Sequence, residues 1–192
     1  MYKIIFAGFG GQGIQTMSKF LAYAAMDNNL NVSWLPSYGP EMRGGTSNCS
    51  VIIGKEPVAS PIITQADAVV VMNNPSLEKF ESYLKKDGIL IIDSNLVNIE
   101  PTRNDIKVIK IPCDEISSNL GNKSLSNMVL LGGLINLTNI VPLESLIASI
   151  KLHGKEKYYN LNKVALQTGY IFIQDNINIF CWYLIFNLLN YK

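Results

Sequence analysis

A glycine-rich turn near the start of the chain places the strongest constraint on its fold. The turn, Gly8–Gly13 (GFGGQG), follows an apolar run at 2–7 and precedes a segment at 14–26 whose apolar residues recur at helical spacing. Strand, tight turn and helix in this order are typical of the first unit of an α/β sheet. A second β-rich run at 32–35 completes a Rossmann-like βαβ start of the kind that makes a parallel sheet.

The rest of the chain continues this alternation and then becomes helical. Asn73 is expected to cap a helix that stops at Gly88, and Ser126 or Asn127 is expected to cap a later one. The sequence therefore predicts an open, mostly parallel α/β sheet flanked by helices, with a helical C-terminal third. The further strands are expected at 47–53, 68–72, 89–92 and 107–111, and the further helices at 114–120, 128–137, 143–150 and 158–170.

Two adjacent glycines, Gly132 and Gly133, lie inside the helix expected at 128–137. Each weakens a helix by roughly 1 kcal/mol relative to alanine. Close packing against another backbone would justify that cost.

The stretch Trp34–Gly45 (WLPSYGPEMRGG) is predicted to be a shaped loop, because its two prolines and three glycines cannot continue a helix or a central strand. Glu41 and Arg43 lie in its middle. A planar guanidinium on a stiff loop suits recognition of a carboxylate, a phosphate or a partner surface. The alternative is an internal Glu41–Arg43 pair that only holds the loop together.

Composition excludes several classes of function. The 192 residues carry 16 basic and 15 acidic side chains, and without a basic stripe they do not predict a nucleic-acid surface. The three cysteines, Cys49, Cys113 and Cys181, are too far apart for an iron–sulfur cluster or structural zinc, and their odd number favours a reducing cytoplasm. The one histidine, His153, is expected at a surface or helix end rather than at a metal.

The glycine turn predicts an anion site, because free N–H groups at the start of the following helix favour negative charge. A nicotinamide or flavin dinucleotide also requires an acidic residue near the end of the second strand, and 32–36 contains none. The turn could equally serve only close packing of helix on strand. A stand-alone anion- or nucleotide-binding module and an NAD-linked dehydrogenase remain as alternatives.

The C-terminal run 177–189 is apolar but interrupted by Asn178 and Asn187. It is shorter than the ~20 residues that cross a bilayer, so no membrane span is expected. The run is expected to be either a terminal helix packed on the domain or on a partner, or an aberrant end that exposes apolar surface.

Several blocks together resemble the gamma subunit, or gamma domain, of the 2-oxoacid:ferredoxin oxidoreductases. They occur in the family's order over about residues 3–170, and the SYGPEMRGG form is similar to the 2-oxoglutarate and branched-chain types. Residues 1–170 are therefore expected to form the gamma domain, with 171–192 as an apolar tail that departs from the family. The blocks are GFGGQG, WLPSYGPEMRGGTSNCSV, MNNPSLEKF, SNMVLLGGL and LNKVALQTGY.

The resemblance implies a heteromeric, cytoplasmic complex that oxidatively decarboxylates a 2-oxoacid, forms acyl-coenzyme A and reduces ferredoxin. Alpha and beta subunits, with a delta subunit in some complexes, would carry the thiamine diphosphate, Mg²⁺ and iron–sulfur clusters. This chain would bind none of these cofactors by itself, would supply no catalytic residue and no metal ligand, and would be inactive alone.

The resemblance also assigns roles to particular residues. Gly8, Gly10, Gly11 and Gly13 would form the turn, and with Arg43 they would accept an anionic group, either a coenzyme A phosphate or the substrate's distal carboxylate. The residues expected to approach the thiamine-bearing subunits are Tyr38, Glu41, Arg43 and Gly44.

Overall fold

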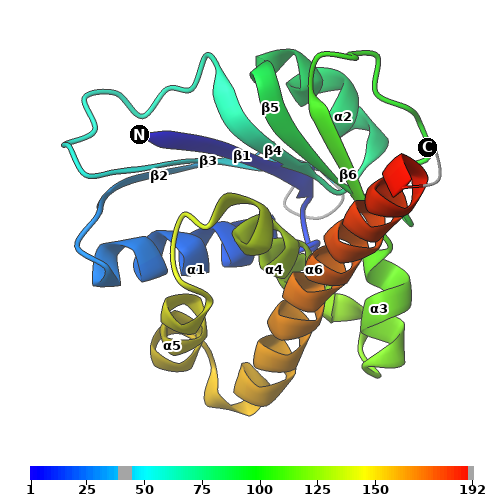
Figure 1. Cartoon of the computed structure of the whole chain (residues 1–192). Coiled ribbons are helices and arrows are strands. Elements are labelled where there is room, and N and C mark those ends of the chain that lie inside the picture. The colour runs from blue at the N-terminus through cyan, green and yellow to red at the C-terminus, as the bar shows by residue number, and fades with distance from the viewer. Residues whose placement is uncertain (39–44, 190–192) are drawn as a thin grey trace.

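The computed structural model describes residues 1–38 and 45–189, and the side chains of 38 and 177–189 fall outside its description. Six described strands form one sheet in the order β2-β3-β1-β4-β5-β6. Figure 1 shows α1, α4, α5 and α6 on one face of the sheet and α2 on the other. The predicted α/β class, mostly parallel sheet and helical C-terminal region are confirmed. The strands are β1 (Tyr2–Phe9), β2 (Asn31–Tyr38), β3 (Thr46–Gly54), β4 (Ala66–Val71), β5 (Leu84–Asp93) and β6 (Lys107–Ile111).

The helices lie close to their predicted positions, with short 3₁₀ turns before or after several of them. The α-helices are α1 (Ile14–Asp27), α2 (Asn74–Phe80), α3 (Cys113–Asn119), α4 (Ser126–Thr138), α5 (Leu143–His153) and α6 (Tyr159–Leu189). The 3₁₀ turns are η1 (Glu81–Tyr83), η2 (Lys123–Leu125) and η3 (Glu156–Tyr158).

The sheet departs from the expected parallel start in one strand. β3 lies between β1 and β2 and is antiparallel to both, so β1 and β2 run in the same direction without pairing. The reason is the connection: only 39–45 separates β2 from β3, and parallel neighbours need a crossover of about a dozen residues or more. The two strands therefore form a hairpin.

The core has two parts, one on each face of the sheet. The larger part packs the sheet against α1, α4, α5 and α6, and includes Phe6, Met17 and Leu131, each fully buried. The smaller part lies under α2 and includes Leu77 and Ile92. Because both faces of the central strands are buried, β1 and β4 have nearly continuous apolar sequences.

The close backbone packing that would justify a glycine in α4 is present at Gly132, where α4 crosses α6. A Cβ on Gly132 would lie 2.0 Å from the carbonyl oxygen of Leu166 in α6, and one on Gly169 would lie 2.0 Å from that of Val129 in α4. Glycine from each helix therefore lets the two backbones touch.

The prediction of one helix from Asn73 to Gly88 is wrong in its second half. Asn73 caps α2 as predicted, its Oδ1 accepting the Ser76 N–H at 2.8 Å, but α2 ends at Phe80 and Leu84 already belongs to β5. An apolar Leu84 satisfies a helical or a strand pattern, and its pairing with Ala66 of β4 decides for the strand.

The start of α4 also differs from prediction. Neither Ser126 nor Asn127 caps the helix, which continues directly from η2 with Leu125 at the N-cap position. At the other end of the chain, α6 extends beyond the predicted limit of 170 to Leu189. Within the described part of the chain, no helix is long and apolar enough to cross a membrane.

Candidate functional site

The glycine turn lies at the carboxyl end of β1, where α1 begins. Gly11 and Gly13 have φ values of 100° and 80°, and Gly13 is the N-cap residue of α1. A side chain is strained in this left-handed region. A Cβ on Gly8 would come within 2.8 Å of the Ile14 side chain. The glycines therefore serve both the turn and the close packing of α1 on β1.

Two amides that sequence reasoning did not single out hold this turn in place. Gln12 Oε1 accepts the Phe9 N–H at 2.6 Å, and its Nε2 donates to the carbonyl of Met72 at the end of β4. Asn127 Nδ2 donates to the Gly13 carbonyl at 3.3 Å. Gln12 lies inside the motif, but no sequence spacing could connect Asn127 with a residue 114 positions away.

The loop is shorter than the predicted Trp34–Gly45, because 34–38 belongs to β2 and pairs with β3. Pro36 is tolerated in this strand because β2 lies at the edge of the sheet. The β2–β3 hairpin brings the two ends of the remaining segment, at Tyr38 and Gly45, to the same sheet edge. Tyr38 pairs with Ser47, and Ser47 pairs with Gly8, so the three backbones lie in one row across the sheet. The Gly10 N–H donates to the Gly45 carbonyl at 2.9 Å. Of the residues expected in the loop, Glu41, Arg43 and Gly44 lie outside the described residues, and so does the side chain of Tyr38.

A cavity of about 300 Å³ lies beside the glycine turn. Its walls are Phe9, Gly10, Gly11 and Gly13 from the turn, the first turn of α1, and Ser47 of β3. The start of α1 carries no side-chain cap, and the free N–H groups of a helix start attract anions. Three of the four predicted turn glycines, Gly10, Gly11 and Gly13, thus line this hollow, whereas Gly8 does not.

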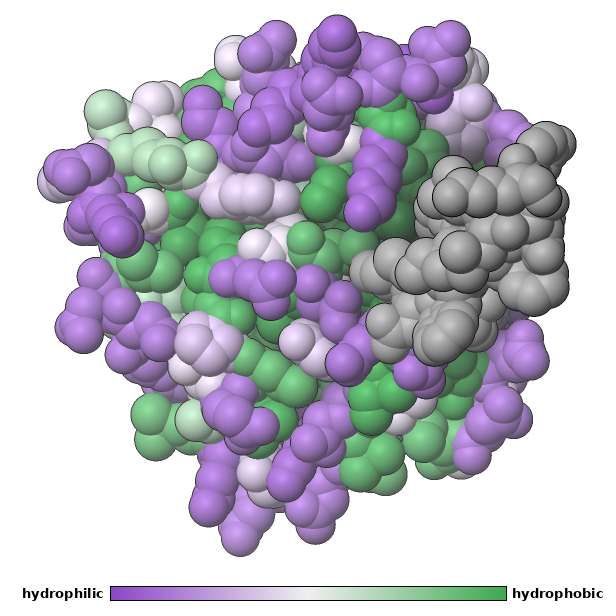
Figure 2. Space-filling model, viewed as in Figure 1, coloured by the Kyte–Doolittle hydropathy of each residue, from purple (hydrophilic) through white to green (hydrophobic). Residues whose placement is uncertain are grey.

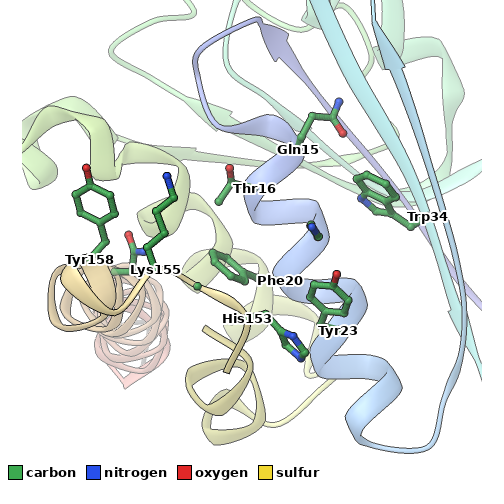
Figure 3. A pocket seen from close by; sticks show the side chains of 11 residues that line it. Gln15, Thr16, Phe20, Tyr23, Trp34, His153, Lys155 and Tyr158 are labelled. Atoms are coloured by element: carbon green, nitrogen blue, oxygen red, sulfur yellow. The ribbon is translucent and has the colours of Figure 1, made fainter. Parts of the chain in front are cut away.

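A larger groove, which we call the α1 groove, continues from this cavity along α1. It encloses about 510 Å³ and shares Gln15 and Thr16 with the cavity at the turn. Figure 3 shows Trp34 of β2 on one side of α1, and Lys155 and Tyr158 on the other. The α1 groove and the turn cavity together form one elongated depression.

The chemistry of the α1 groove combines aromatic rings with positive charge. The Trp34 indole N–H donates to Ser18 Oγ at 3.0 Å, which fixes the ring. His153, the last residue of α5, stacks on Tyr23 with ring centroids 4.0 Å apart. Lys19 Nζ lies 5.4 Å from the Tyr23 ring centroid. Such a surface can hold a flat ring next to an anionic group.

Gln15 lies between the two hollows and presents an acceptor atom. Its Nε2 donates to Ser47 Oγ at 3.1 Å and to the Asn48 carbonyl at 3.0 Å. Its Oε1 is buried and accepts no hydrogen bond in the described structure. Buried polar atoms are normally paired, so a ligand N–H or O–H would complete this site.

The buried thiols near the sheet are poor candidates for chemistry. Burial raises the pKa of Cys49 to about 11, and burial, with the nearby Asp93, raises that of Cys113 well above its usual value. Both are free cysteines that stay protonated near neutral pH. The described residues contain no group of three or more His, Cys, Asp or Glu side chains that could hold a metal ion.

The second strand gives no support to a dinucleotide site. β2 reads NVSWLPSY and contains no carboxylate that could hold ribose hydroxyls.

Comparisons with known proteins agree with this fold. Ketoisovalerate oxidoreductase subunit VorA of Methanothermobacter thermautotrophicus is 36% identical over 179 residues, which cover 91% of this chain and 37% of VorA. The chain thus spans little more than a third of that relative's length. 2-Oxoglutarate synthase subunit KorC of Methanocaldococcus jannaschii is 33% identical over 171 residues, which cover 88% of this chain and 91% of KorC.

A solved structure gives the same result. The gamma subunit of a keto/oxoacid ferredoxin oxidoreductase from Geobacter sulfurreducens superimposes with a TM-score of 0.80 at 28% identity, covering 91% of this chain and 99% of that subunit. The family model described as pyruvate ferredoxin/flavodoxin oxidoreductase matches residues 3–172. The chain belongs to the pyruvate ferredoxin/flavodoxin oxidoreductase family.

Proposed function

We propose that this chain is the gamma subunit of a heteromeric 2-oxoacid:ferredoxin oxidoreductase. The observation that carries the proposal is the reciprocal coverage of about nine-tenths shared with KorC and with the Geobacter gamma subunit. The complex would convert a 2-oxoacid, with 2-oxoglutarate or a branched-chain acid favoured, into acyl-coenzyme A and CO₂ while reducing ferredoxin. The names of the relatives, ketoisovalerate oxidoreductase and 2-oxoglutarate synthase, support this choice.

In this proposal the chain supports catalysis without performing it. Alpha and beta subunits, with a delta subunit in some complexes, would carry the thiamine diphosphate, Mg²⁺ and iron–sulfur clusters. The protonated, separately buried Cys49 and Cys113 do not suit a cluster. The fold of residues 1–170 would be the working gamma domain, 171–192 an appendage, and the complex cytoplasmic.

The ligand role falls on the glycine turn and the loop that follows β2. We propose that Gly8, Gly10, Gly11 and Gly13 shape the anion site and that Arg43 contributes to it, accepting a coenzyme A phosphate or the distal carboxylate of the acid. The cavity of about 300 Å³ at the turn supports this, as does the Gly10–Gly45 hydrogen bond at the loop's end. Tyr38, Glu41 and Gly44 would face the thiamine-bearing subunits.

Two experiments test the proposal. Co-expression with the candidate partner subunits should give a complex that reduces a dye in the presence of thiamine diphosphate, coenzyme A and one of several 2-oxoacids, whereas the chain alone should be inactive. Turnover by the isolated chain, or no complex with any such subunits, would refute the assignment. In the assembled complex, Arg43→Met should raise the apparent KM for coenzyme A or for the acid; unchanged kinetics would reject its ligand role.

A further inference from the structure

The outward face of α6 has an unusual composition for the surface of this chain. Leu161, Val164 and Ile171 are 39%, 46% and 52% exposed and follow one another at helical spacing. From 159 to 176, the part of the helix whose side chains are described, it carries two charged residues, Lys163 and Asp175, in a chain with 31 charged side chains in total (16 basic and 15 acidic). Exposed apolar residues on a helix with few charged residues are typical of the centre of a protein interface.

The opposite side of α6 is already used by the domain. Ala165, Leu166 and Ile173 are buried against the core, and α6 touches α4 along the glycine crossing. The exposed residues therefore belong to a helix whose position is fixed. A rigid helix face of this kind loses little conformational entropy on binding.

A basic rim borders the N-terminal end of this face. Lys151, Lys155 and Lys157 are exposed and are accompanied in that segment by one acid, Glu156. None of the three lysines pairs with a carboxylate among the described residues; Lys85, Lys110 and Lys123 are the described lysines that do. The positive end of the α6 helix dipole points the same way.

On the molecular face along which α6 runs, hydrophobic surface lies between hydrophilic side chains (Figure 2). Leu152 and Tyr158, 72% and 43% exposed, add apolar area beside the basic rim. We call Leu161, Val164 and Ile171, with Lys151 and Lys157 at their edge, the α6 surface.

We propose that the α6 surface docks another subunit of the oxidoreductase, through an apolar patch on that subunit bordered by carboxylates. This inference rests on the proposed function, because it assumes a heteromeric complex. Charge complementarity selects the occupant: lysines without a carboxylate partner near the start of α6 favour acidic residues opposite them. The α6 surface would add a second contact to the one proposed for Tyr38, Glu41, Arg43 and Gly44.

The test places a photo-crosslinking amino acid at Val164 or Ile171 in the co-expressed complex. Both sites should crosslink to another subunit, and the crosslinked segment should contain Asp or Glu. The same probe at Ile62, which is 62% exposed and lies outside the α6 surface, is the matched control. Crosslinks to a second copy of this chain, or none at Val164 and Ile171, would overturn the inference.

Affinity for the remaining preassembled subunits gives a second measurement. Ile171→Asp should raise the dissociation constant about tenfold or more, since it places a charge in a desolvated contact. Lys151→Glu with Lys157→Glu should raise it about threefold to tenfold at low salt, and less at about 0.5 M salt. The control pair, Lys55→Glu with Lys86→Glu, should change neither value.

The outcomes separate this inference from the proposed function. A wild-type chain that binds the oxidoreductase subunits while the α6 variants, folded by circular dichroism, bind equally well refutes the α6 surface alone. A wild-type chain that binds none of these subunits refutes the proposed function and the inference with it.

Discussion

Replacing Gly132 by alanine tests the helix crossing on which the helical layer depends. The new Cβ would lie 2.0 Å from the Leu166 carbonyl oxygen and 2.8 Å from the Tyr170 nitrogen. Both are backbone atoms of α6, so no side chain can rotate away. Since real contacts stay above about 3.0 Å, the two helices must separate by about 1 Å.

The expected free energy follows from two opposing terms. Overpacking of a core typically costs about 1–3 kcal/mol, and a rigid backbone contact belongs at the upper end. Alanine in place of glycine improves helix propensity by about 1 kcal/mol. Gly132→Ala should therefore lower the free energy of unfolding by about 2 kcal/mol net, and lower Tm by roughly 4–8 °C for a chain of this size.

Urea denaturation followed by circular dichroism measures this loss. The control is the neighbouring substitution Gly133→Ala, whose Cβ would lie 2.5 Å from Ile111 Cδ1 and 3.3 Å from Ile173 Cγ1. Because these are side-chain atoms that can move, the control should lose less than about 1 kcal/mol. If Gly132→Ala proves as stable as the wild type, the close approach of α4 and α6 is not a determinant of stability.

Three further perturbations test the glycine turn and the buried carboxylate of Asp93. Gln12→Ala leaves the Phe9 N–H without its acceptor and should destabilise the chain by about 1–3 kcal/mol in urea; an unchanged midpoint would show that water replaces the amide. Gly13→Ala should destabilise more, because φ is 80° and the Cβ would lie 2.2 Å from Asn127 Nδ2, and adding Asn127→Ala should restore only part of the loss. Burial raises the pKa of Asp93 from 3.8 to about 6, so the stability it contributes is complete below about pH 4 and is lost as the pH rises through 6. Asp93→Asn should therefore gain up to about 3 kcal/mol on the wild type between pH 4 and pH 7.5, and a constant difference would contradict the burial of a carboxylate.

Much of the architecture was predictable because local patterns and tertiary packing agree. The apolar run before Gly8, the Asn73 cap and the glycine pair in α4 each have one favourable structural solution, and the structure adopts it. Where a pattern had two solutions, tertiary pairing decided. Leu84 fits a helix face or a strand, and its pairing with Ala66 of β4 places it in the sheet.

The site was less predictable than the fold. The glycines predicted the turn, but the contacts that hold it involve distant residues. Asn127 donates to Gly13, 114 residues away, and Gln12 donates to the Met72 carbonyl. Backbone acceptors leave no trace in side-chain patterns. The α1 groove likewise assembles Trp34 and Lys155 from distant segments, and only the folded chain brings them to opposite sides of α1.

The reversed strand β3 has a consequence for how members of this family can diversify. β3 pairs with β1 at eight positions and with β2 at eight positions. This pairing holds the end of β2 and the start of β3, which flank 39–45, beside the glycine turn. Changes of length or sequence in 39–45 therefore need not disturb any other strand. Exchanging residues 39–45 with the equivalent segment of a relative should thus leave the scaffold intact.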